Sequence, residues 1–74
     1  MVFDKLKLDS PEDAVKLNEL ACKYNGKLNV NCGSSIIDAK SLLALLTLIG
    51  KKNIKLVAPD HDDPNKFAQL IKKI

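Results

Sequence analysis

The chain has 74 residues, of which 46% are hydrophobic and 28% charged, and its formal net charge is +3. A chain this short holds one domain, so we expect a single domain over residues 1–74 and exclude a large multi-domain enzyme. The composition is too apolar for a disordered tail, and the longest apolar run, residues 42–46, is far too short to span a bilayer. Asp4 stands where a signal peptide needs basic residues, which argues against export. We therefore predict a soluble cytoplasmic protein with no membrane association.

All twelve basic residues are lysines, and the chain has no arginine. Arginine is the side chain that binds guanine and phosphate through a rigid bidentate fork, so its absence is unusual for a protein that reads nucleic acid. The aromatic residues are also few and scattered: Phe3, Tyr24 and Phe67. We expect no nucleic-acid partner.

Cys22 and Cys32 lie ten residues apart, a spacing that matches neither a metal knuckle nor a redox pair. Both occur in apolar-periodic segments, so we expect two free thiols that pack as small apolar side chains, and one structural disulfide between them is the alternative. The sequence also has no glycine-rich phosphate loop, nucleophile triad or paired buried carboxylates. We expect no metal, no cofactor and no enzymatic activity.

The first quarter of the chain predicts a strand followed by a helix. Apolar residues and lysines alternate over residues 2–8, with three apolar side chains on one side: Val2, Leu6 and Leu8. Ser10 and Pro11 have the residue types of an N-cap and a first helical position, so a helix begins there. Its buried stripe ends at residues 25–26, an Asn-Gly pair that favours left-handed backbone.

The middle of the chain predicts a hairpin and a second helix. Alternation over residues 27–32 indicates a strand, and residues 33–34 form a tight turn into an antiparallel strand over residues 35–37. An apolar helix then covers residues 42–49 and ends at Gly50.

The last part predicts a fourth strand over residues 54–58, which Pro59 ends, and a third helix that starts at Asp63 and Pro64 and runs to the chain end. The resulting order is βαββαβα. The most economical packing is an α+β fold in which one antiparallel sheet is covered on one face by the helices.

This element order and two stretches of sequence resemble HPr, the small phosphocarrier family of the bacterial sugar phosphotransferase system. The stretches are residues 21–25 and residues 39–48, the second of which contains Lys40 and Ser41. The resemblance covers most of residues 11–74. It implies an open-faced β-sandwich with a four-stranded antiparallel sheet and three helices.

One departure from the family lies before the first helix. In HPr this loop carries a histidine that accepts phosphate, then a small residue, an arginine and a proline. Alignment through residues 21–25 places Ser10 at the histidine and Glu12 at the arginine. A serine phosphate is a stable ester, and Glu12 and Asp13 would repel it. We predict that Ser10 is only a helix cap and that the phosphoryl relay is absent.

Ser41 resembles the family's regulatory serine. Its hydroxyl stands just before the apolar helix, where it can cap that helix, and a phosphate there would be favoured by the helix dipole. By resemblance, a serine kinase of the HPr kinase type would modify it, with Lys40 beside the added charge. A simple cap and a regulatory phosphorylation site are both open interpretations.

The helix over residues 42–49 is apolar on all sides except at Thr47. If Leu42, Leu45 and Ile49 face the core, two leucines must point outward or sideways, namely Leu43 and Leu46. In the family, this helix and the first one form the surface where protein partners dock. The resemblance therefore implies a partner-binding surface, and the alternative is that the last helix or loops bury its residues as core: Val15, Leu42, Leu43 and Leu46.

The negative charge near the first helix argues against phosphoryl transfer from Enzyme I, the usual phosphate donor of the HPr family. Glu12 and Glu19 place negative charge where the basic surface of HPr meets the acidic Enzyme I, so encounter with that enzyme would be slowed. His61 is the sole histidine and is flanked by acids, and we interpret it as part of a solvated loop and not as a metal ligand.

Together these features predict an HPr-like, non-catalytic module for protein interaction or regulation, with serine phosphorylation as its control. The alternative is a genuine phosphotransfer component that carries phosphate on His61 or Ser10. A structural domain whose apolar helix merely packs is a third interpretation.

Overall fold

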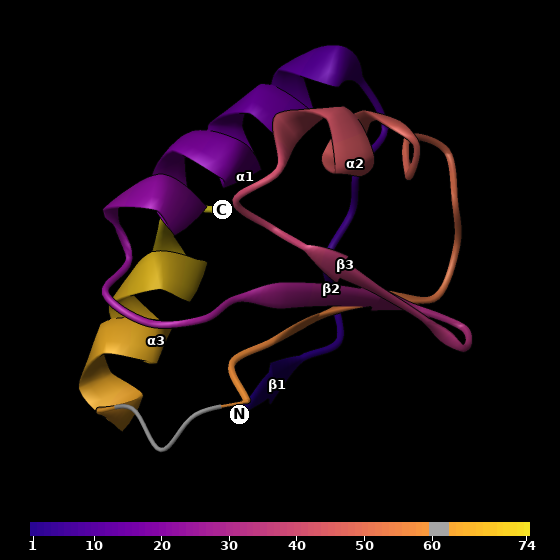
Figure 1. The fold of residues 1–74 in the computed structure, drawn as a ribbon. Helices are drawn as coiled ribbons and strands as arrows, with labels where there is room; N and C mark the ends of the chain where they lie inside the picture. Colours follow the sequence, from indigo (N-terminus) through magenta and orange to yellow (C-terminus); the bar gives the residue numbers. More distant parts are fainter. Residues whose placement is uncertain (60–62) are drawn as a thin grey trace.

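The computed structural model describes residues 1–59 and 63–74. Its elements in chain order are β1 (Val2–Phe3), α1 (Pro11–Lys23), β2 (Asn29–Cys32), β3 (Ser35–Asp38), α2 (Leu42–Leu46), β4 (Ile54–Val57) and α3 (Pro64–Lys72) (Figure 1). In this described part the strands form one four-stranded antiparallel sheet in the order β1-β4-β2-β3. Of the helices in the same part, none combines the length and the apolarity that crossing a bilayer requires.

The helices cover one face of the sheet. Val30 and Leu56 pair directly across β2 and β4, and both are fully buried. Their neighbours Asn31 and Lys55 also pair and point to the opposite face, because side chains alternate along a strand. Every helix contributes to the single core on the first face, with Ala14, Leu17 and Ala21 from α1, Leu45 from α2, and Phe67 and Leu70 from α3. The predicted α+β open-faced β-sandwich is confirmed.

The first strand is much shorter than the alternating pattern predicts. β1 ends at Phe3, a turn follows over residues 4–5, and Leu6 and Leu8 are buried without belonging to the sheet. Val2 is 59% exposed, so it does not share a face with those leucines as expected. The physical reason is tertiary, since the Leu8 carbonyl accepts a hydrogen bond from the Gly50 N–H at 2.8 Å and pairs with no strand.

Both long helices begin where their caps predict. Ser10 is the N-cap of α1, and Asp63 is the N-cap of α3, where its side chain accepts a hydrogen bond from the Asn65 N–H at 2.9 Å. The end of α1 differs from the prediction. The C-cap is Tyr24 in an extended conformation, and positive φ occurs at Gly26 but not at Asn25.

The second helix is also shorter than predicted, because α2 ends at Leu46 and turns lead to Gly50, whose φ is 82°. Thr47 contributes to this early end, since its hydroxyl donates to the Ala44 carbonyl at 2.6 Å. With the helical spacing broken, Leu48 is buried in the core, and Ile49, which was expected there, is only half-buried.

Candidate functional site

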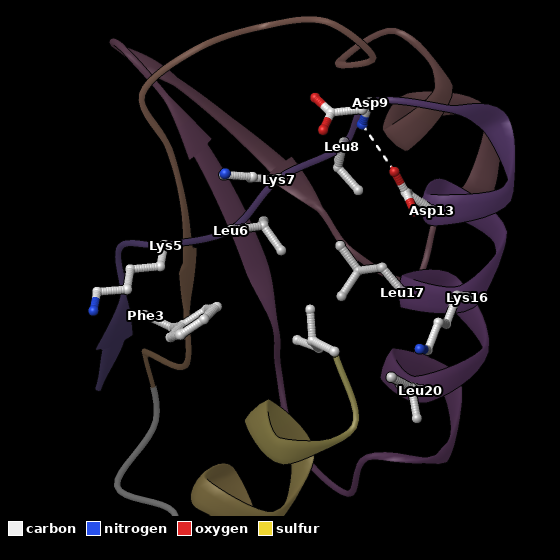
Figure 2. A pocket seen from close by; sticks show the side chains of 11 residues that line it. Phe3, Lys5, Leu6, Lys7, Leu8, Asp9, Asp13, Lys16, Leu17 and Leu20 are labelled. Carbon is white, nitrogen blue, oxygen red and sulfur yellow. Dashed lines mark hydrogen bonds between the residues drawn. The ribbon is translucent and has the colours of Figure 1, made fainter.

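The start of α1 is closed by its own side chains. The Ser10 hydroxyl accepts a hydrogen bond from the Asp13 N–H at 3.4 Å, and the Asp13 carboxylate accepts from the Ser10 N–H at 3.2 Å. The same carboxylate oxygen accepts from the Asp9 N–H at 3.0 Å, the dashed line in Figure 2. Pro11 has no N–H to offer. The backbone donors of Asp9, Ser10 and Asp13 are therefore occupied before any external anion arrives.

The charge at this helix start is negative. Asp9 and Glu12 are exposed, and Asp13 is half-buried in the capping network. A phosphoryl group on Ser10 would meet these carboxylates and would also have to displace the Asp13 carboxylate from its hydrogen bonds. The arrangement stabilises a helix start, and its carboxylates and occupied backbone donors disfavour a dianion on Ser10.

A pocket of about 380 Å³ lies beside this helix start, between α1 and the segment that leads into it. Figure 2 shows that Leu6 and Leu17 point toward one another across it, whereas the Lys5 side chain extends away. Lysines and acids are mixed around its rim: Lys5, Lys7, Lys16, Asp9 and Asp13. The alternating pattern of residues 2–8 predicts a strand and therefore gives no indication of this pocket, which depends on the strand ending at Phe3.

The apolar side chains of α2 are divided between the core and the surface. Leu45 and Leu48 are buried, and Leu42 is half-buried against the core. Leu43, in contrast, is 79% exposed, and Leu46 is 36% exposed. The alternative that the last helix or loops bury these two leucines is therefore wrong.

The α1 side chain predicted to join this surface is also exposed, since Val15 has 40% of its area accessible. Asn18, three residues later on the same side of α1, donates from Nδ2 to the Ala39 carbonyl at 3.4 Å. Ala39 comes shortly before α2, and Figure 1 shows α1 and α2 lying side by side. Val15 thus lies on the side of α1 that faces the start of α2.

Ser41 holds the N-cap position of α2, but its hydroxyl makes no capping hydrogen bond. The expected cap is therefore wrong in its chemistry, although the position is right. Ser41 and Lys40 are both exposed. Asp38 fixes the backbone there, because its main-chain carbonyl accepts from the Ser41 N–H at 3.1 Å and its carboxylate accepts from the Lys40 N–H at 2.9 Å. The result is an exposed hydroxyl on a well-anchored backbone.

The two cysteines are free, as predicted, but they differ in burial. Cys32 is half-buried against the core, and Cys22 is exposed on α1, so its predicted packing is wrong. Among residues 1–59 and 63–74, no three His, Cys, Asp or Glu side chains form a group that could hold a metal ion. The interpretation of His61 concerns a position outside the described residues.

No family model and no curated protein matches the chain. Among solved structures, the chain is similar to the crystal structure of HPr-C-His from Thermoanaerobacter tengcongensis. The TM-score is 0.70 with 17% sequence identity, and the match covers 97% of this chain and 85% of that one. At this identity the similarity establishes the fold alone. The chain therefore has the HPr-like fold that its element order and sequence stretches predict.

Proposed function

We propose that this HPr-like chain is a non-catalytic module that binds a protein partner through α2 and the adjoining side of α1. The observation that carries the proposal is the exposure of Leu43, at 79%, beside Leu46 on the same short helix. The fold does not need these side chains, because Leu45 and Leu48 already anchor the segment in the core. Exposed apolar groups clustered on one element are typical of an interaction surface.

The start of α1 supports the non-catalytic part of the proposal. By the family resemblance, Ser10 occupies the place of the phosphate-accepting histidine, and its hydroxyl is engaged with the Asp13 N–H. The neighbouring Asp13 carboxylate occupies two further backbone donors. A phosphocarrier needs an acceptor that is free to receive and release phosphate, and Ser10 lacks that freedom.

Phosphorylation of Ser41 is the proposed control of docking. The Ser41 side chain is exposed and its hydroxyl makes no capping hydrogen bond, so modification would not cost α2 a cap. Phosphate would add a charge of about −1.5 to −2 directly before Leu42 and Leu43. An apolar partner would then have to bury or avoid that charge, which weakens its binding.

The first experiment tests phosphoryl transfer. The full chain is incubated with phosphoenolpyruvate, Enzyme I and magnesium, with an active HPr as the positive control. We expect intact-mass analysis at neutral pH to show no phosphate added to this chain. Labelling that disappears in His61→Ala or Ser10→Ala would overturn the proposal and establish a phosphotransfer component.

The second experiment tests docking. Immobilised wild type, Ser41→Asp and Leu43→Ser are compared in pull-downs from the native host, and Val2→Ser is the matched control because Val2 is exposed on a different element. A partner retained by wild type and by Val2→Ser but lost with Leu43→Ser supports the surface, and its loss with Ser41→Asp supports the control. Equal retention of the partner by all four proteins would contradict the docking proposal. Sedimentation of the wild type shows whether the partner is a second copy.

A further inference from the structure

A second pocket, of about 240 Å³, lies between the C-terminal end of α1 and α3. Figure 1 shows α3 alongside that end of α1. The pocket is lined from α1 and the residues that follow it by Leu20, Lys23, Tyr24 and Asn25, and from α3 by Lys66, Gln69, Leu70 and Lys73. None of these residues belongs to the α2 docking surface.

The charged side chains that line this α1–α3 pocket are all lysines. Lys23, Lys66 and Lys73 line it, and no carboxylate side chain of a described residue does so. The pocket beside the start of α1 contains Asp9 and Asp13 next to its lysines, and a third pocket near residues 51–54 contains acids as well. Like charges gathered in one concave site repel one another, and a bound anion relieves that repulsion.

Helix stability does not account for all three lysines. Lys23 and Lys73 lie at the C-terminal ends of their helices, where a cation interacts favourably with the helix dipole. Lys66 lies in the first turn of α3, where the dipole disfavours a cation. Since Lys66 and Lys73 are seven residues apart, they share one side of α3 with Leu70. The helix dipole alone therefore does not explain a lysine at position 66.

The remaining lining suits the organic part of a ligand. Tyr24 and Leu70 are buried and Leu20 is half-buried, so they form an apolar floor. Asn25 and Gln69 are exposed and can donate or accept hydrogen bonds. The pocket volume of about 240 Å³ is below the range of about 300–1,000 Å³ that is usual for ligand sites, so the pocket suits a small ligand.

The geometry points to a binding site for a small phosphate ester. The ammonium groups of the three lysines hold the phosphate, because lysine binds phosphate as a point charge. The carbon skeleton lies on Tyr24 and the two leucines, and the amides bind its polar groups. Binding here is independent of phosphoryl transfer and of docking on α2.

The test is a nuclear magnetic resonance titration of the uniformly labelled full chain with phenyl phosphate, and in parallel with inorganic phosphate. We expect chemical-shift changes concentrated at the lining residues, with phenyl phosphate bound more tightly than inorganic phosphate. Lys66→Gln and Lys73→Gln each weaken phenyl phosphate binding by about threefold or more. Lys72→Gln is the matched control, because it removes the same charge from the same helix but does not line the pocket.

Three results would overturn this site. Equal weakening by Lys72→Gln and Lys73→Gln would show general charge attraction. Equal affinity for phenyl phosphate and inorganic phosphate would show that the floor binds no organic group. Tighter binding of a single-stranded oligonucleotide through the same lysines would replace a metabolite site with a nucleic-acid surface. Circular dichroism of each variant checks that the fold is retained.

Discussion

Ser10 and Asp13 each accept a hydrogen bond from the other's backbone N–H, Ser10 through its hydroxyl at 3.4 Å and Asp13 through its carboxylate at 3.2 Å. This reciprocal pair is a capping box in which aspartate takes the place of the more usual glutamate or glutamine. The helix start is thereby satisfied from within the chain. The same groups that stabilise α1 leave no open donor pair at the position where the family resemblance places phosphate chemistry.

The two N-cap serines should differ in their contribution to stability. Ser10→Ala removes a capping hydrogen bond and should lower the free energy of unfolding by about 1 kcal/mol. Ser41→Ala removes a hydroxyl that caps nothing, so its effect should stay within about 0.5 kcal/mol. Urea denaturation of both variants measures the difference, and equal losses would contradict it.

Local chemistry explains why the starts of α1 and α3 were predictable from sequence. Ser10 with Pro11 and Asp63 with Pro64 act on the backbone within one helical turn, and no distant residue is needed. The segment of residues 4–9 was not predictable in the same way. Its alternation is real, but a turn and the hydrogen bond to the Gly50 N–H decide its path, and Gly50 is remote in the sequence.

The candidate surfaces likewise have some features that follow from local sequence and others that depend on residues remote in the chain. Outward exposure of Leu43 follows from helical geometry once Leu45 is placed in the core. Burial of Leu48 in place of Ile49 depends on where α2 ends, which the Thr47 hydroxyl influences. The α1–α3 pocket joins side chains more than forty residues apart, such as Lys23 and Lys66, so no local pattern could have indicated it.

The hairpin between β2 and β3 should be sensitive at one position. Gly33 has a φ of 60° and follows Cys32, which pairs with Ser35, so it is the first residue of a two-residue turn. A Cβ there meets nothing within 4 Å, so the cost of Gly33→Ala is backbone strain alone, about 1 to 3 kcal/mol. Ser34→Ala is the control, because the backbone of Ser34 does not have a positive φ. Thermal unfolding of both variants checks this, and a neutral Gly33→Ala would contradict it.

The two thiols should react at different rates. Cys22 is exposed on α1, and Cys32 is half-buried against the core, so an alkylating reagent should modify Cys22 first in the folded chain. Mass spectrometry of peptides after brief treatment with N-ethylmaleimide measures the order. Cys22→Ser should remove the fast phase and leave the slow one. Faster modification of Cys32 would show that its thiol is more accessible than that of Cys22 and would contradict the prediction.

Two leucines in the same helix should separate stability from binding. Leu45 is fully buried, so Leu45→Ala should lower the free energy of unfolding by about 2 to 5 kcal/mol. Leu43 is largely exposed, so Leu43→Ala should change that free energy by less than about 0.5 kcal/mol while weakening binding to the protein partner. Chemical denaturation measures the first effect, and binding of the purified partner measures the second. If Leu43→Ala destabilised the fold as strongly as Leu45→Ala, its side chain would be part of the core and α2 would have no apolar surface to offer.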